Sequence, residues 1–237
     1  AEGARVNLFA DALSWLADPS HWQGSGGIPL RIGQHLLLTA LALVIASIIA
    51  LPAGALLGRT RSGGAVIGAV AGSARALSTI GVLTLVGLWL GIGIGPPLVA
   101  LVVLAVPSLL AGAYSGVQSV PGEVTAASRA IGMSSAQVIR RVELPLALPV
   151  IVGGARAAAL QVVATATLAA YTADVGLGRY LFTGLKTQDY GQMLAGSILV
   201  ILLAIILELA FAALQRLAAR HAAPHSTPAL SSRRTSS

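Results

Sequence analysis

The hydrophobic pattern of the chain consists of long apolar runs, not of the short amphipathic repeats of a soluble domain. A helix needs about 20 mostly apolar residues to cross roughly 30 Å of hydrocarbon. The segment 32–58 has no charged residue and predicts a first membrane span at about 32–57. A fourth span is predicted at about 148–171, interrupted only by Arg156, and a fifth at about 192–214, interrupted only by Glu208.

The segment 76–122 is also free of charged residues. As a single helix it would be about 70 Å long, more than twice the hydrocarbon thickness, so the chain must reverse within it. The run 91–97, rich in glycine and proline, is the only strong helix breaker there. It predicts a second span at about 66–90 and a third at about 97–118. The expected fold class is therefore an all-α membrane protein with five transmembrane helices.

The composition agrees with a membrane protein. Of the 237 residues, 56% are hydrophobic and 10% are charged, whereas a soluble domain carries about 25% charged residues. This excludes a soluble globular domain, a disordered chain and a nucleic-acid-binding module. The chain has no cysteine, which excludes a disulfide framework, thiol catalysis and a cysteine-ligated metal site.

The formal net charge of +7 reflects the orientation of the spans. Cytoplasmic loops carry an excess of Lys and Arg. Basic residues follow span one, lie between spans three and four, and follow span five: Arg59, Arg61, Arg129, Arg140, Arg141, Arg216, Arg220, Arg233 and Arg234. We therefore expect the N-terminus outside and both the loop 119–147 and the C-terminus in the cytoplasm.

The two ends of the chain are expected to lie outside the membrane domain. The segment 5–22 is too short and polar to span, and it predicts an amphipathic helix at the outer interface, with Trp15 and Trp22 at headgroup level. The segment 1–29 is thus an extracellular or interfacial region, and 30–217 is the membrane domain. The segment 218–237, rich in Ser, Thr, Pro and Arg, is predicted to be a disordered cytoplasmic tail.

The cytoplasmic loop 119–147 predicts two short helices. The first covers 123–131, with Glu123 in its first turn and Gly132 just past its end. Ser134 or Ser135 caps the second, which reaches residue 142, and Pro145 stops it and starts the next span. Such a pair would lie against the inner face of the membrane and is shaped to dock into a partner.

The order Ala126-Ala127-Ser128, then Gly132, then Val142-Glu143-Leu144-Pro145 resembles the EAA loop of permease subunits of bacterial ATP-binding-cassette (ABC) importers. The resemblance implies the type I ABC importer permease fold, with a coupling helix that inserts into a cleft of a cytoplasmic ATPase. Ala126 departs from the glutamate usual at that position, and Glu123 lies one turn earlier. The coupling residues implied are Glu123, Ala126, Ala127, Ser128, Arg129, Gly132, Met133, Arg140 and Arg141. The alternative is an ordinary amphipathic loop.

The resemblance covers about 30–217 and is greatest for the osmoprotectant branch, on Gln34-His35-Leu36, Gly132-Met133 and the segments 142–149, 176–178, 182–185 and 194–197. It implies a multi-pass plasma-membrane permease that imports glycine betaine, choline, carnitine or proline betaine by alternating access. Ser78-Thr79-Ile80-Gly81 departs from the Gln-Thr-Ile-Pro typical of that branch. The alternatives are an importer of another solute (an amino acid, methionine or taurine) and a non-transporting membrane scaffold.

The same resemblance implies a set of partners. These are a second permease subunit, identical or related, two cytoplasmic ATP-binding subunits that hold ATP and Mg²⁺, and an extracellular solute-binding protein, in some cases lipid-anchored. The chain itself is expected to be no enzyme and to bind no cofactor or metal, because it lacks a phosphate-binding loop and a serine-centred triad.

Two further groups of residues are expected to meet the solute or the binding protein. The substrate pathway is expected at Ser78, Thr79, Thr84, Tyr114 and Thr167, and the contact with the binding protein at Asp174, Arg179 and Lys186. Asp174 could instead cap the next segment. Only 4% of the residues are aromatic, so a tight aromatic cage for a quaternary ammonium is not expected.

Charges inside spans are costly and mark candidate functional sites. For Arg156 two alternatives are open: a structural or gating role near the ATPase, or a side chain that snorkels to the inner surface. For Arg75 snorkelling is expected. Glu208 is expected to pair with a basic residue on a neighbouring helix. Glycines spaced four apart, such as Gly54 and Gly58, predict close helix packing, either within one subunit or between subunits.

Overall fold

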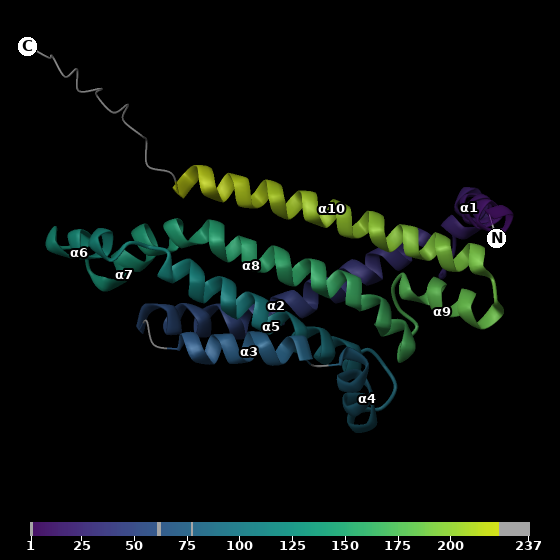
Figure 1. Ribbon diagram of the computed structural model, residues 1–237, viewed down its shortest axis with the longest axis horizontal. Coiled ribbons are helices and arrows are strands. Elements are labelled where there is room, and N and C mark those ends of the chain that lie inside the picture. Colours follow the sequence, from purple (N-terminus) through teal and green to yellow (C-terminus); the bar gives the residue numbers. More distant parts are fainter. Residues whose placement is uncertain (1, 61–62, 77, 223–237) are drawn as a thin grey trace, which may run out of the picture.

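The computed structural model describes residues 2–60, 63–76 and 78–222, and in this part of the chain every regular element is a helix. Four long helices run along the long axis of the molecule (Figure 1): α2 (Ile28–Thr60), α5 (Gly95–Gln118), α8 (Leu144–Thr165) and α10 (Tyr190–Ala222). Each belongs to a helical segment long and apolar enough to cross a membrane. Four of the five predicted spans therefore correspond to such segments.

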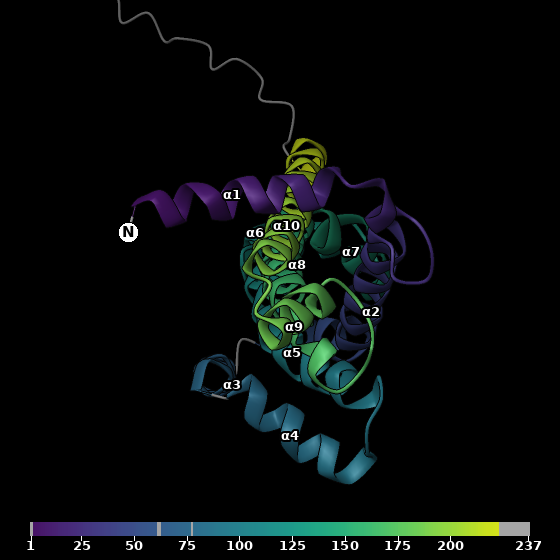
Figure 2. The same ribbon diagram turned by 90° about the vertical axis from the view of Figure 1, so that its right-hand side faces the viewer.

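The second predicted span, 66–90, is not one continuous helix. It consists of α3 (Gly64–Ala76) and α4 (Thr79–Leu90), which run in different directions in Figure 2. Ser78 between them is extended, with φ −72° and ψ 117°, and its Oγ accepts a hydrogen bond from the Gly81 N–H at 3.3 Å. Because a serine cap starts a new helix, hydrophobicity alone did not reveal the break.

The chain reversal predicted at 91–97 is confirmed. Gly91 and Gly93 have φ values of +79° and +150°, a backbone region that favours glycine. The Gly93 N–H donates to the Thr172 carbonyl at 3.1 Å, which ties the turn to the end of the fourth span. Helix α5 then starts at Gly95, with proline in its first turn, where a missing N–H costs nothing.

The helix stop predicted at Pro145 is wrong. Helix α7 (Ser135–Val138) continues through a π-helical turn, η2 (Ile139–Glu143), directly into α8. The wider i→i+5 turn accommodates a proline, which has no N–H to donate and whose ring crowds the preceding carbonyls. At its other end α8 tightens into the 3-10 segment η3 (Ala166–Tyr171). The segment from Ser135 to Tyr171 is thus continuously helical.

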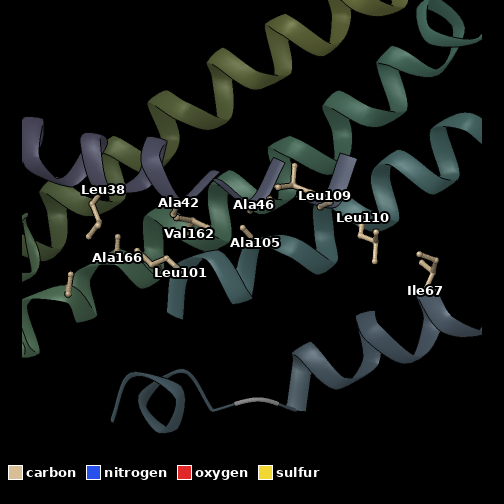
Figure 3. Close-up of a cluster of buried hydrophobic side chains, with 13 residues drawn as sticks. Leu38, Ala42, Ala46, Ile67, Leu101, Ala105, Leu109, Leu110, Val162 and Ala166 are labelled. Atoms are coloured by element: carbon tan, nitrogen blue, oxygen red, sulfur yellow. The ribbon is translucent and has the colours of Figure 1, made fainter. Parts of the chain in front are cut away.

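The core lies between α2, α5 and α8 and consists mainly of small side chains. In Figure 3, Ala42, Ala46 and Ala105 lie among leucines of α2 and α5 and Val162 of α8. Glycines permit the close crossings: a Cβ at Gly54 would lie 2.5 Å from the Leu110 carbonyl oxygen, and one at Gly154 would lie 2.6 Å from the Gly112 Cα. Small residues let membrane helices approach in this way, so these glycines pack within one subunit.

Three glycines of α3 and α4 are arranged differently. A Cβ at Gly68, Gly72 or Gly87 would have no heavy atom of the described residues within 4 Å. Packing inside the subunit therefore does not account for these three positions, and a role between subunits stays open for them.

The structure describes helices on both sides of the segment 30–217 that was predicted to be the membrane domain. Helix α1 (Glu2–Ala17) and the 3-10 turn η1 (Pro19–Trp22) precede the membrane helices. Helix α10 continues to Ala222, into the segment predicted to be a tail. The remainder of that tail, 223–237, lies outside the described residues.

Gly178, the first residue of α9 (Gly178–Thr187), offers a direct test of this packing. A Cβ there would overlap the Thr167 carbonyl oxygen, a backbone atom that cannot rotate away. We expect Gly178→Ala to destabilise the fold by about 1–3 kcal/mol. The measurement is the thermal unfolding midpoint of the purified protein in detergent. Gly33→Ala, at an exposed site in α2 with open space around it, is the control, and an equal midpoint for both variants would contradict the contact.

Candidate functional site

The two short helices predicted in the loop 119–147 form largely as expected. Helix α6 covers Gly122–Ala130, and Gly132 beyond its end has φ +87°. Ser134, rather than Ser135, caps α7: its Oγ accepts from the Gln137 N–H at 3.3 Å, and the Gln137 Oε1 accepts from the Ser134 N–H at 2.8 Å. This reciprocal capping box fixes the turn between the two helices.

The α6–α7 pair lies at one end of the molecule, opposite α1 and α9 (Figure 1). Among the nine predicted coupling residues, Ser128 is buried, with its Oγ donating to the Val124 carbonyl at 2.7 Å, and Met133 is half-buried. The other seven are exposed: Glu123, Ala126, Ala127, Arg129, Gly132, Arg140 and Arg141. The structure thus leaves most of the predicted surface available to a partner.

An ion pair ties this loop to the end of the first membrane helix. The Arg59 Nε lies 3.0 Å from the Glu143 Oε2, and the Arg59 Nη2 donates to the Glu143 Oε1 at 3.4 Å. Glu143 belongs to the π turn η2, and its side chain is 10% exposed. The same two residues, with Arg129, line a polar hollow of about 120 Å³ between α2, α5 and α6. Glu143 was not among the predicted coupling residues, because its partner lies far away in the sequence.

A second ion pair lies within the membrane helices. The Arg156 guanidinium of α8 makes a two-pronged contact with the Glu208 carboxylate of α10, and its Nε donates to the Glu208 Oε2 at 2.8 Å. The Arg156 Nη1 also donates to the Gln215 Oε1 at 3.2 Å. The Gln215 Nε2 in turn donates to the Pro149 carbonyl at 3.2 Å. The prediction that Glu208 pairs with a basic residue on a neighbouring helix is confirmed.

At the opposite end of the molecule, the start of α2 holds the loop 172–178. The Gln34 Oε1 accepts from the Gly176 N–H at 3.1 Å. The His35 Nδ1 accepts from the Leu177 N–H at 3.3 Å, so its Nε2 carries the proton and donates to the Val163 carbonyl at 2.9 Å. The Gln34-His35 motif therefore positions this loop through its hydrogen bonds.

The residues expected to meet the binding protein lie around the same loop. The Asp174 Oδ1 forms two ion pairs, with the Arg31 Nη2 at 3.0 Å and the Arg179 Nε at 3.2 Å. Its side chain is 64% exposed, whereas that of Arg31 is 9% exposed. Lys186 is exposed in the last turn of α9. The structure brings Asp174 and Arg179 together, and Arg31 is the residue that the sequence prediction missed.

The residues expected along the substrate pathway do not form one cluster. Ser78 caps α4, and Thr79 faces a narrow crevice that is also lined by Thr165. The hydroxyls of Thr84 and Thr167 bond within their own helical segments, to the carbonyls of Ile80 and Ala164. The Tyr114 hydroxyl accepts from the Gln118 Nε2 at 2.8 Å and would lie 3.0 Å from a Cβ at Gly64. Tyr114 thus lies against the start of α3, apart from Thr79.

Comparison with known proteins then identifies the family. Residues 30–223 match the family described as "Binding-protein-dependent transport system inner membrane component". The chain belongs to this family. It is therefore a multi-pass membrane component of a binding-protein-dependent importer, which works with a substrate-binding protein and with separate ATP-binding subunits.

Curated relatives confirm the resemblance to the osmoprotectant branch. The chain is 35% identical over 196 residues to the glycine betaine/carnitine/choline transport system permease protein OpuCB of Bacillus subtilis, covering 82% of this chain and 90% of the relative. It is also 35% identical over 183 residues to the osmoprotectant import permease protein OsmW of Salmonella typhimurium, covering 74% and 84% respectively.

A solved structure supports the fold. A chain of the MetNI methionine ABC transporter, in an inward-facing conformation, superposes with a TM-score of 0.69 at 24% identity, covering 85% of this chain and 99% of that chain. The chain thus has the type I ABC importer permease fold.

Proposed function

We propose that the chain is the permease subunit that carries a small osmoprotectant across the plasma membrane by alternating access, driven by ATP hydrolysis in partner subunits. The solute class is a quaternary ammonium compound such as glycine betaine, choline, carnitine or proline betaine. The names of the relatives, which describe importers of such solutes, support this assignment.

The observation that carries the proposal is the exposed α6–α7 pair at the end of the bundle. The pair is joined to two membrane helices at once, to α8 through the continuous π turn and to α2 through Arg59 and Glu143. A displacement of this surface by a docked ATPase would therefore be transmitted to both helices. ATP and Mg²⁺ would be held by that ATPase and not by this chain.

The assembly that we propose has two permease chains, identical or related, two ATP-binding subunits and an extracellular binding protein. In it α3 and α4 together make the second of five crossings, so the two termini lie on opposite sides of the membrane. The distribution of basic residues then puts the N-terminus outside and the C-terminus in the cytoplasm. Asp174, Arg179 and Lys186 would then face the binding protein. The scarcity of aromatic residues favours a low-affinity passage, with solute selection in the binding protein.

The experiment that tests this function is uptake by the reconstituted complex. Radiolabelled glycine betaine, choline and carnitine would be offered to proteoliposomes with the cognate binding protein, and binding to that protein would be measured separately. We expect ATP-dependent uptake of at least one of these solutes. Uptake of an amino acid, methionine or taurine instead would overturn the solute class, and absence of ATP-dependent uptake of every solute would favour the scaffold alternative.

Replacing Glu143 with Gln is expected to lower the rate of coupled uptake about tenfold. The variant removes a charge-assisted contact worth about 1.5–3 kcal/mol and leaves Arg59 unpaired beside the loop. Uptake and substrate-stimulated ATP hydrolysis in proteoliposomes are the measurements. The charge exchange Arg59→Glu with Glu143→Arg should recover part of the rate, and Arg220→Gln, at an exposed site near the end of α10, is the control. Unchanged uptake in Glu143→Gln would rule out transmission through this pair.

A further inference from the structure

Helix α1 lies outside the residues that match the family and has an unusual orientation. In Figure 1 it is seen nearly end-on beside the outer end of α10, whereas the membrane helices run across the view. In Figure 2, which looks along those helices, α1 lies crosswise and its N-terminal part projects beyond the bundle. The axis of α1 is therefore roughly perpendicular to the spans, which is the direction of the membrane plane.

Close packing holds α1 in this orientation. Ala12 is completely buried, and a Cβ at Gly191 of α10 would lie 3.0 Å from the Asp11 Cβ. The Trp15 ring meets the Tyr180 ring of α9 edge-on, with centroids 5.1 Å apart. The Tyr180 hydroxyl donates to the Gly26 carbonyl at 2.6 Å, and burial raises the pKa of this phenol, so it stays protonated. Helix α1 is thus anchored to both α9 and α10.

The connection after α1 is also fixed. The His21 ring stacks on Trp15 with centroids 3.9 Å apart, and its Nδ1 lies 2.8 Å from the Trp15 carbonyl oxygen. The Trp22 Nε1 donates to the Leu16 carbonyl at 2.8 Å. Since the helix cannot roll without breaking these contacts, each of its flanks points in a defined direction.

The two flanks of α1 differ in polarity. Successive helical residues are about 100° apart, so positions 9 and 13 lie on one side of the packed Leu8 and Ala12, and positions 7, 11 and 14 on the other. On the first flank, Phe9 is 60% exposed and Leu13 is 63% exposed. The second flank carries the polar residues Asn7, Asp11 and Ser14, all exposed.

The residue that follows α1 reinforces the polar side. Asp18 accepts a hydrogen bond from the Ser20 N–H at 2.8 Å, and this bond lowers the pKa of its carboxyl group. Asp18 is therefore charged at neutral pH and remains in water. Nearby, Trp22 is 48% exposed, in keeping with the enrichment of tryptophan at the headgroup level of a bilayer.

We propose that α1 lies in the outer headgroup–acyl boundary of the bilayer, with Phe9 and Leu13 in lipid and the Asn7–Asp11–Ser14 flank in water. A lipid interface fits because the helix axis lies in the membrane plane, at the level where the spans end. Along residues 7–14 the large exposed apolar side chains and the polar side chains also lie on separate flanks. Helix α1 then holds the outer ends of α9 and α10 at a fixed height in the membrane.

Single-cysteine spin labelling tests the proposal cleanly, because the chain contains no native cysteine. The full-length variants Leu13→Cys and Ser14→Cys would be labelled in lipid nanodiscs, and collision rates would be measured with oxygen, which concentrates in lipid, and with a water-soluble nickel chelate. We expect the oxygen-to-nickel ratio to be several-fold higher at position 13 than at position 14. Phe9→Cys and Asn7→Cys form a second matched pair with the same expectation.

Two results would overturn the proposal. Equal, nickel-accessible labels at positions 13 and 14 would place α1 in water, away from the bilayer. A label at position 13 that neither reagent reaches would mean that protein covers this flank, either a second copy of the chain or the binding protein. Either result would have to be repeated by the labels at positions 9 and 7 before it overturned the proposal. A local perturbation caused by one label therefore cannot mimic it.

Discussion

Replacing Gly132 with Asp is expected to abolish uptake and to uncouple ATP hydrolysis from it, while the chain still inserts into the membrane. The backbone at Gly132 has φ +87°, and a Cβ there would have no heavy atom of the described residues within 4 Å. The new side chain would therefore leave the packing of the subunit unchanged. It would instead project from the α6–α7 surface that we assign to the ATPase, and place a carboxylate there.

The controls for Gly132 separate backbone strain from altered docking. Gly132→Ala introduces roughly 1–2 kcal/mol of strain at a left-handed position without adding charge. Gly132→Asn adds a larger uncharged side chain, and asparagine tolerates this backbone conformation. We expect uptake to fall in the order wild type, Gly132→Ala, Gly132→Asn, Gly132→Asp. Insertion is followed by the amount of protein in the membrane fraction. Uptake and substrate-stimulated hydrolysis that survive in Gly132→Asp would show that the coupling assignment is wrong.

The other large effect is expected for Glu208→Leu, which should destabilise the protein by about 2–4 kcal/mol. The variant leaves the Arg156 guanidinium between α8 and α10 without its carboxylate, and removing one partner of a fully buried pair costs about 3–5 kcal/mol. The side chains here are 34% and 32% exposed, which reduces the expected cost. The thermal unfolding midpoint in detergent measures it, and an unchanged midpoint would show that the pair contributes little.

The double variant Arg156→Met with Glu208→Leu should recover most of that stability, because an apolar pair can replace an ion pair of similar volume. Uptake by the double variant then decides between the two roles open to Arg156. Recovered stability with recovered uptake indicates a structural pair. Recovered stability without uptake indicates that the charges themselves take part in gating between α8 and α10.

The positions of the membrane helices could be predicted because charge-free apolar runs have a direct physical cause in the bilayer. The same signal could not resolve α3 from α4, since Ser78 interrupts a segment that is apolar on both sides. The stop at Pro145 was predicted from the proline itself, and there a π turn carries the helix onward. In both cases a local backbone feature, the Ser78 cap or the π turn at 139–143, determined whether the helix breaks or continues.

Within the loop 119–147, the end of α6 and the start of α7 could be predicted because they depend on local capping. Gly132 and Ser134 act on residues within three or four positions of themselves. The contacts that hold this loop, and those at the opposite end of the bundle, were not predictable in this way. Arg59 and Glu143 are 84 residues apart, and Gln34 and Gly176 are 142 residues apart, and no periodicity in one sequence connects such positions.

The hydrogen bonds from Gln34 and His35 to the loop 172–178 also constrain the order in which the protein is built. The start of α2 leaves the ribosome long before that loop, whereas α10 follows it. Once α8 has been made, the loop finds its hydrogen-bond partners Gln34 and His35 already in place. The hydrogen bonds between α2 and the loop can thus form during synthesis, and α10 arrives afterwards to pack Leu203 into the cluster that contains Leu177.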